Sequence, residues 1–180
     1  IVAANDGNVS VKLEDGTFLC TPSGVSKAAM TPEILVHLAA DGSVIYAAEG
    51  YKPSSEMKMH FRCYAEREDV KAVVHAHPPI ATSYASMGRA LDGYQVMEFI
   101  VNLGAVPIAP YAQPSTDEVP DSIAPFLQDH DAILLAHHGA LTVGDSLTRA
   151  YFRMESLEMF AKTSLYIHLL GGAPDMPQDK

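Results

Sequence analysis

Apolar and polar residues alternate in two stretches near the start of the chain. Residues 9–20 alternate on both sides of an Asp15-Gly16 pair, and residues 33–48 do so around Asp41-Gly42. Alternation with period two is typical of half-buried strands, and Asp-Gly is typical of the tight turns that join them. The pattern predicts two antiparallel hairpins.

Helical spacing of apolar residues first occurs in residues 57–64. Ser54 or Ser55 precedes this run and is expected to cap the helix, with Glu56 in its first turn. Residues 71–77 then form an apolar run that reads as a strand and is stopped by two prolines.

In residues 84–116 the pattern of apolar residues interrupted by glycine and proline predicts a short turn of helix, followed by broken strands. Residues 116–130 are expected to be helical. Pro120 is tolerable near the start of this helix, whereas Pro125 should kink or end it.

An apolar run at residues 132–139 predicts a buried strand. Asp145 or Ser146 can then cap a long amphipathic helix that ends at Gly171-Gly172. Because strand pairs come first and helices follow, we expect a mainly antiparallel sheet with helices packed on it, in a single domain over residues 1–180.

The composition and net charge limit the classes of partner that the protein is expected to bind. The 180 residues are 48% hydrophobic and 19% charged, with no apolar run of the ~18 residues that a membrane span needs. A net charge of -10 without a basic cluster argues against nucleic acid and anionic membrane surfaces as partners. Cys20 and Cys63 lack any metal-ligand spacing and are expected to be reduced packing residues. With no secretory leader visible at Ile1, we expect a cytoplasmic protein.

Two histidines end the run KAVVHAHPP. In a strand, alternate side chains share a face, so His75 and His77 point to the same side. Two neutral imidazoles gain little from each other, but a divalent metal can bind both. An ordinary buried or surface role for each histidine remains the alternative at this point.

A third ligand is available from His137 or His138, which close the predicted strand before Gly139. Adjacent strand residues face opposite ways, so only one of them can join the pair. Three histidines and one open position are the donor set of a catalytic zinc.

Several polar residues are suited to binding an anion. Ser54 and Ser55 offer hydroxyls and free N–H groups at a helix start, although helix capping alone would explain one serine. The turn at Ser23-Gly24 offers a nest of backbone N–H groups, and Asn8 offers a side-chain amide. Each of these is also ordinary turn chemistry.

Six short motifs together resemble the class II aldolase/adducin family, most closely its L-fuculose-phosphate aldolase branch. The similarity spans residues 5–165, and the motifs occur in the family's order. In this chain they read GNVS, TPSG, SSE, HAHPP, LGAVPIAPYAQPST and HHGALTVG.

The resemblance implies a function and a set of site residues. It implies a zinc-dependent aldolase that reversibly cleaves a short ketose 1-phosphate into dihydroxyacetone phosphate and an aldehyde. It implies that Zn²⁺ is held by His75, His77 and His138, and that Glu56 is the catalytic acid/base. The implied phosphate-binding residues are Asn8, Ser23, Gly24, Ser54 and Ser55.

The resemblance also implies a three-layer α/β/α subunit in a homotetramer, with a sugar-phosphate site between neighbouring subunits. This chain departs from the family in three places. Chains of this family usually carry a helix ahead of the GN motif, and almost nothing precedes that motif in this sequence. Val96 stands where the aldolases have a tyrosine, and no obvious match to a second tyrosine is found before Lys180.

Two alternatives remain. A pentulose-phosphate 4-epimerase would usually have Asp at Glu56 and another acid at the position of Ile100, so the sequence favours the aldolase over this or another family sugar-phosphate lyase. A non-catalytic adducin-like scaffold would lack the ligands, which this chain retains.

Overall fold

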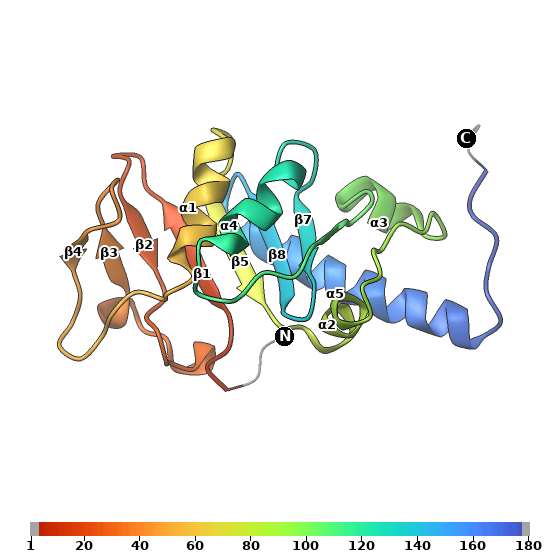
Figure 1. Ribbon diagram of the computed structural model, residues 1–180, viewed down its shortest axis with the longest axis horizontal. Coiled ribbons are helices and arrows are strands. Elements are labelled where there is room, and N and C mark those ends of the chain that lie inside the picture. Colours follow the sequence, from red (N-terminus) through yellow and green to blue (C-terminus); the bar gives the residue numbers. More distant parts are fainter. Residues whose placement is uncertain (1–3, 178–180) are drawn as a thin grey trace.

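One mixed sheet organises the molecule (Figure 1). The computed structural model of the chain describes residues 4–177. The sheet has eight strands in the order β4-β3-β2-β1-β5-β8-β7-β6. The strands are β1 Asn8–Lys12, β2 Phe18–Cys20, β3 Val36–Leu38, β4 Val44–Tyr46, β5 Ala72–Ala76, β6 Ile108–Ala109, β7 Ala132–Leu135 and β8 Gly139–Gly144.

Every neighbouring pair of strands is antiparallel except β6 and β7. The predicted hairpins β1–β2 and β3–β4 are confirmed, with Asp-Gly turns between their strands. In the centre, β5 lies between β1 and β8. This arrangement brings the first hairpin beside the strand that carries His75.

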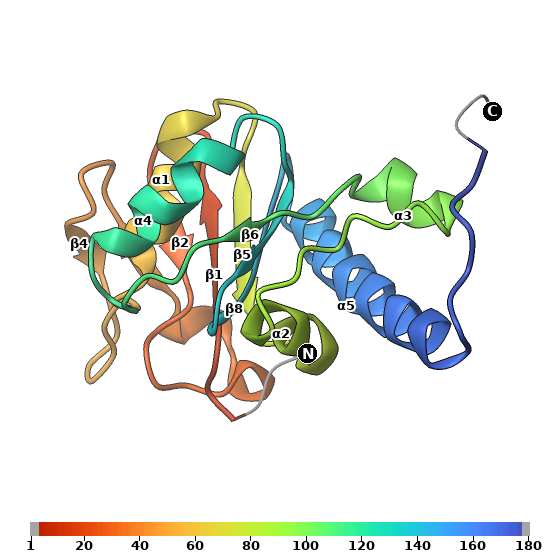
Figure 2. The same cartoon turned by 45° about the vertical axis from the view of Figure 1, so that its right-hand side comes forward.

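Helices cover both faces of the sheet (Figures 1 and 2). They are α1 Met57–Glu66, α2 Pro79–Ser86, α3 Met97–Asn102, α4 Glu118–Ile123 and α5 Leu147–Leu169, with single 3₁₀ turns η1 Lys27–Ala29, η2 Pro32–Ile34 and η3 Ala124–Phe126. None of the helices in the described part of the chain has the length and apolar character to cross a bilayer.

The two faces of β5 bury different helices because successive strand residues point to opposite sides. Val73 packs in the cluster formed with α1 and α4, whereas Ala72 and Val74 pack in the cluster formed with α2, α3 and α5. The structure is therefore the expected three-layer α/β/α fold.

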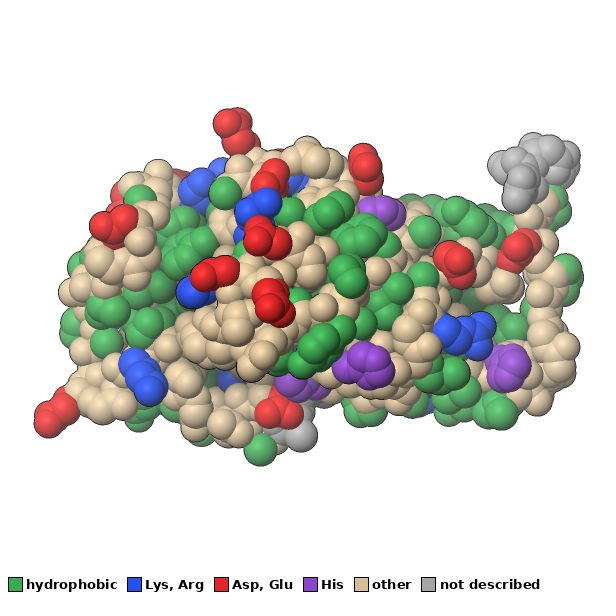
Figure 3. Space-filling view, viewed as in Figure 1, with side chains coloured by type: hydrophobic (Ala, Val, Ile, Leu, Met, Phe, Trp, Pro, Cys, Tyr) green, Lys and Arg blue, Asp and Glu red, His purple; other side chains and the backbone are tan. Residues whose placement is uncertain are grey.

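Acidic and basic side chains gather on the outer surface (Figure 3), and two ion pairs connect α1 with α4 and its N-cap residue. Lys58 Nζ lies 2.7 Å from Asp117 Oδ1, and Arg62 Nη1 lies 3.3 Å from Asp121 Oδ1. Exposed pairs of this kind contribute at most about 1 kcal/mol each, so buried apolar contacts decide where these helices lie.

Several local predictions were wrong. One strand was predicted over residues 132–139, but the structure has two strands there, β7 and β8, separated by a turn. The second of these, β8, lies between β5 and β7 in the sheet. Residues 97–102 form a helix and not a strand, because Phe99 and Leu103, four residues apart, pack together on α5's side of the sheet. The expected serine cap of α1 is also absent, because the N-cap residue is Glu56. The Ser54 hydroxyl accepts a hydrogen bond from the backbone N–H of Glu56 and from none within the helix.

The predictions at helix ends were confirmed elsewhere. α4 gives way to a 3₁₀ turn containing Pro125, because proline cannot donate the next helical hydrogen bond. Ser146 caps α5 by accepting from the Arg149 N–H. Both cysteines are buried and unpaired within the described residues.

Candidate metal centre and active site

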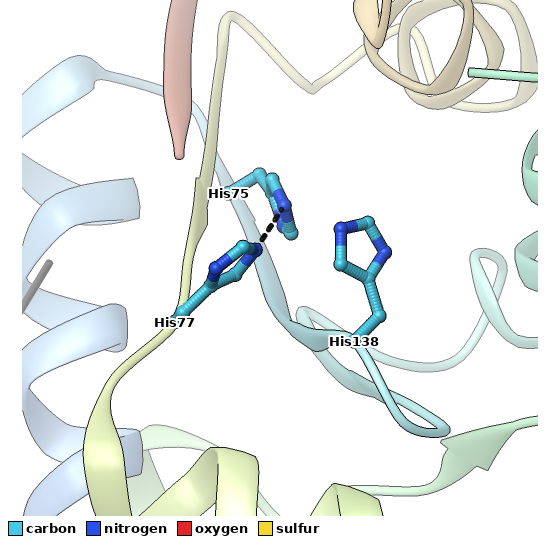
Figure 4. A group of neighbouring side chains, drawn as sticks. All are labelled: His75, His77 and His138. Carbon is cyan, nitrogen blue, oxygen red and sulfur yellow. Dashed lines mark hydrogen bonds between the residues drawn. The ribbon is translucent and has the colours of Figure 1, made fainter. Parts of the chain in front are cut away.

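Three histidines from two parts of the chain meet at one end of the central strands (Figure 4). His75 lies in β5, His77 follows that strand, and His138 lies in the turn between β7 and β8. One ligand nitrogen from each lies within 4.8 Å of the others. His75 is fully buried, while His77 and His138 are half-buried.

The pairing of β5 with β8 creates this meeting point. His75 lies opposite Leu141, and Ala76 lies opposite Ala140, so the turn before β8 is held against the end of β5. Gly139 makes the approach possible. A Cβ atom at Gly139 would lie 2.5 Å from His77 Cδ2 and 2.7 Å from the Ala76 carbonyl oxygen.

The ring nitrogens have the spacing of ligands to one ion. His75 Nδ1 lies 2.9 Å from the Ala140 carbonyl oxygen, to which it donates, leaving the Nε2 lone pair directed into the cluster. The Nε2 atoms of His75 and His77 are 3.1 Å apart. Two nitrogens at about 2.0–2.1 Å from a tetrahedral zinc lie roughly 3.3 Å from each other, so the donor set fits this metal.

The electrostatics of the site favour a neutral His75 ring. Complete burial lowers the pKa of His75 to about 4, although the nearby Glu56 carboxylate acts in the opposite direction. An imidazole binds metal only in its neutral form. The buried ring is therefore ready to bind a metal at neutral pH.

The Glu56 carboxylate lies against the cluster. Its Oε1 is 3.2 Å from His138 Nε2, and its Oε2 is 3.5 Å from His75 Nε2. Oε1 is buried and makes no aligned hydrogen bond to any group in residues 4–177. A buried carboxylate oxygen without a donor is a group that a cation or a substrate proton would satisfy.

Opposing effects set the pKa of Glu56. Burial raises the pKa of Glu56, but its contacts with the His138 and His75 rings and with the amide of Asn8 together lower it to about 2. The carboxylate is therefore ionised at neutral pH and able to accept a proton.

His137 does not join the cluster. Its backbone is left-handed, with φ 56°, and its N–H donates to the Ala85 carbonyl oxygen. Its ring instead lies near the exposed Tyr111, with 6.2 Å between the ring centroids. As expected, only one of the two histidines joins the metal cluster. The expected reason was wrong, because β7 already ends at Leu135 and both histidines lie in the turn that follows it.

Most of the candidate phosphate-binding residues line one small cavity beside the cluster. This cavity, of about 180 Å³, also reaches Glu56 and His77. Its lining includes Asn8, Ser23, Gly24 and Ser54. Gly24 has φ +76°, a conformation that side chains with a Cβ rarely adopt.

Ser55 lies apart from this cavity. It is exposed, and its hydroxyl lies 2.8 Å from the Ser115 hydroxyl. The expected set of phosphate ligands is therefore brought together without the Ser55 side chain.

The buried polar side chains that support Asn8 from the core were not identified from the sequence. His60, Ser10 and Tyr64 form a buried hydrogen-bond chain that reaches Asn8. Asn8 and Ser10 share a face of β1, and His60 and Tyr64 are one helical turn apart on α1. These polar residues at strand and helix spacing were the available signal.

Glu158 of α5 is a second missed residue. Its carboxylate accepts hydrogen bonds from the backbone N–H groups of Ile80 and Ala81, at distances from 2.9 to 3.1 Å. This contact holds the first turn of α2, directly after His77. The sequence feature that could have indicated this role is an acidic residue within the otherwise apolar segment 157–161 of the predicted helix.

Comparison with known proteins agrees with this architecture. Residues 1–165 match the family model of the class II aldolase and adducin N-terminal domain. The chain belongs to the class II aldolase/adducin family.

Three similar proteins illustrate the relationship. The chain is 35% identical over 173 residues to 3-oxo-tetronate 4-phosphate decarboxylase of Escherichia coli K12, covering 93% of this chain and 78% of the relative. It is 32% identical to the L-fuculose phosphate aldolase of the same organism, over 95% of this chain and 77% of the relative. The solved L-fuculose-1-phosphate aldolase of Thermus thermophilus superposes with a TM-score of 0.82 at 34% identity, covering 97% of this chain and 90% of that one.

Proposed function

We propose that this protein is a zinc-dependent lyase that reversibly cleaves a short ketose 1-phosphate into dihydroxyacetone phosphate and an aldehyde. The observation that carries this function is the position of Glu56, an ionised carboxylate 3.2 Å and 3.5 Å from two of three clustered imidazoles. In this proposal His75, His77 and His138 hold the metal, and Glu56 moves the proton.

The chemistry follows from the charges involved. Breaking the bond between C3 and C4 of the ketose leaves its electron pair on C3, as an enediolate. A divalent ion held by the three imidazoles would supply the positive charge that stabilises this anion. During cleavage the C4 hydroxyl loses its proton as the aldehyde forms, the Glu56 carboxylate can take up that proton, and Glu56 then gives it to C3. In the reverse direction Glu56 takes a proton from the hydroxymethyl carbon of dihydroxyacetone phosphate.

The adjacent cavity supports a phosphate at the far end of the substrate. Asn8, Ser23, Gly24 and Ser54 present amide, hydroxyl and backbone groups there, without a lysine or arginine in its lining. Neutral donors in a nest hold phosphate through directed hydrogen bonds. The Ser55 hydroxyl would have to leave Ser115 in order to contribute.

A 3-oxo acid phosphate is the second candidate substrate. Its supporting observation is the 35% identity to 3-oxo-tetronate 4-phosphate decarboxylase. Loss of CO₂ from such an acid leaves the electron pair on the carbon beside the ketone, which is the same enediolate. No aldehyde forms in this reaction, so no group is needed to exchange a proton with an aldehyde oxygen, which is consistent with Val96 at the position of the aldolase tyrosine.

One assay separates the two substrates. The purified protein would be incubated with a panel of ketose 1-phosphates and with 3-oxo-tetronate 4-phosphate, and dihydroxyacetone phosphate, aldehyde and CO₂ would be measured. Aldehyde formation that a chelator abolishes supports the aldolase, and CO₂ release with the acid alone assigns the decarboxylase. Failure to form dihydroxyacetone phosphate from any of these substrates would contradict both.

We further propose a homotetramer with active sites between subunits, as the family resemblance implies. Large apolar side chains such as Val101, Phe152 and Leu169 are more than half exposed on the single chain, and a neighbouring subunit would bury such groups. Light scattering should give about four times the chain mass of 19.4 kDa. A monomer that retains activity would contradict the shared site.

A further inference from the structure

A buried hydrogen-bond chain reaches the Glu56 carboxylate from the core of the protein. His60 is fully buried, with Nε2 2.5 Å from Asn8 Oδ1 and Nδ1 2.7 Å from Ser10 Oγ. Ser10 Oγ in turn lies 2.7 Å from the Tyr64 hydroxyl. At the other end, Asn8 Nδ2 donates to Glu56 Oε2 at 2.8 Å.

Two regular spacings build this chain. Asn8 and Ser10 are two residues apart on β1 and therefore point to the same face of the sheet. His60 and Tyr64 are four residues apart on α1 and lie one above the other. The polar row of the helix packs directly on the polar row of the strand.

Only one set of donors satisfies every contact. The ionised Glu56 carboxylate accepts only, so the Asn8 NH₂ group must face it and the Asn8 oxygen must face His60. His60 Nε2 therefore carries a hydrogen. In the neutral ring Nδ1 then accepts from the Ser10 hydroxyl, which leaves the Ser10 oxygen to accept from Tyr64.

The neutral state of the ring is physically favoured. Burial lowers the pKa of His60 to about 3, against the opposing effect of the Glu56 carboxylate. A neutral imidazole has one donor and one acceptor nitrogen, which matches one acceptor at Asn8 and one donor at Ser10.

The consequence for the site concerns the Asn8 amide. If this amide rotated by half a turn, its oxygen would face the Glu56 carboxylate oxygen, and the two acceptors would repel each other. The Ser54 hydroxyl, which accepts from Asn8 Nδ2 at 3.2 Å, would then have to donate to the Asn8 oxygen instead. The orientation of Asn8 thus holds both the carboxylate and one wall of the cavity.

We propose that His60 is a positioning residue for the lyase reaction: as the neutral ring with hydrogen on Nε2, it fixes the Asn8 amide, which in turn holds Glu56 for proton transfer. In this tautomer the Ser10 hydroxyl donates to Nδ1 of His60 and accepts from the Tyr64 hydroxyl. This role rests on the proposed function of Glu56, and it differs from a packing role because it requires a hydrogen-bond donor at one defined position.

Variants at His60 test this requirement. His60→Leu removes both ring nitrogens, whereas His60→Gln can return one N–H donor to Asn8. Cys63→Ala is the matched control, because Cys63 is equally buried on α1 but lies outside the hydrogen-bond chain. The readouts are zinc content, melting temperature and exchange of the hydroxymethyl proton of dihydroxyacetone phosphate in D₂O.

The expected pattern is specific to a positioning role. His60→Leu should keep its zinc but exchange about 10²-fold more slowly, since a base displaced by about 1 Å loses catalysis on this scale. His60→Gln should recover most of the rate, and Cys63→Ala should exchange like the parent. Parent-like exchange in His60→Leu, or equally slow exchange in the Leu and Gln variants, would overturn the proposal.

The ring itself gives a test that needs no variant to be active. With ¹⁵N-labelled histidine, and His60→Gln used only to assign the signal, the parent should show a neutral His60 with a protonated Nε2. A hydrogen on Nδ1 would overturn the proposal. Absence of exchange in the parent would count against the proposed lyase function instead, and the tautomer would still decide the role of His60.

Discussion

Asn8 and His75 lie directly opposite each other across the antiparallel pair β1–β5. One residue is a candidate metal ligand, and the other donates to the carboxylate beside that metal site. The register of a single strand pair therefore aligns the proposed metal, base and phosphate groups. A one-residue shift of this register would move Asn8 to the opposite face of the sheet.

Metal content is the first prediction. We expect about one zinc per chain, because three imidazoles and one open position complete a catalytic site. His138→Ala should lose most of this metal, whereas His137→Ala should keep it, since the His137 ring lies toward Tyr111. Elemental analysis of the two purified variants decides between them. Zinc retained by His138→Ala and lost by His137→Ala would reverse the assignment.

Gly139→Ala should weaken the metal site without removing any ligand. The added Cβ would contact the His77 ring and the Ala76 carbonyl oxygen, both closer than real Cβ contacts allow. Movement of these groups should cost about 1–3 kcal/mol of stability, as overpacking usually does. Zinc titration and thermal unfolding would measure the two effects. Parent-like zinc affinity would show that the turn adapts freely.

Ser23→Ala should weaken binding of a phosphorylated ligand. A donor lost from a charged partner costs about 1–3 kcal/mol, and Ser23 lines the candidate phosphate cavity. Ser55→Ala is the matched control and should have little effect, because its hydroxyl is bonded to Ser115. Calorimetry with phosphoglycolohydroxamate, a mimic of the enediolate, compares the two. A larger loss for Ser55 than for Ser23 would favour the full set of ligands that the sequence suggested.

Glu158→Ala should destabilise the start of α2. The carboxylate accepts from two backbone N–H groups, and hydrogen bonds to a charged group contribute about 1.5–3 kcal/mol each. Glu155→Ala is a suitable control, since its carboxylate bonds only to the exposed Tyr151 within the described structure. Denaturant unfolding of both variants gives the difference. Equal stability of the two would show that water replaces Glu158 without cost.

The local pattern of residues was enough to predict part of the structure. Asp-Gly pairs within alternating segments identified both hairpins, and strand alternation placed His75 and His77 on one side. The strand β8 was missed because Gly139 and Gly144 at its ends resemble turn residues. Their small size instead serves close packing against His77 and Ala150, which depends on the tertiary fold.

The supporting groups of the site could not be predicted because they depend on long-range contacts. Asn8 meets Glu56 and His60 across about fifty residues of chain, and no local spacing records that meeting. A short, mostly apolar segment such as 97–102 fits a strand or a helix equally well until its neighbours are known.

Proton exchange tests the central claim most directly. Glu56→Gln keeps the size of the side chain but cannot accept a proton, and the three histidines remain to hold zinc. In D₂O the parent should exchange one hydroxymethyl proton of dihydroxyacetone phosphate without an aldehyde, as followed by proton NMR. The zinc-loaded Glu56→Gln protein should exchange more slowly by a factor of about 10²–10⁴. Parent-like exchange in that variant would contradict the assignment of Glu56 as the base.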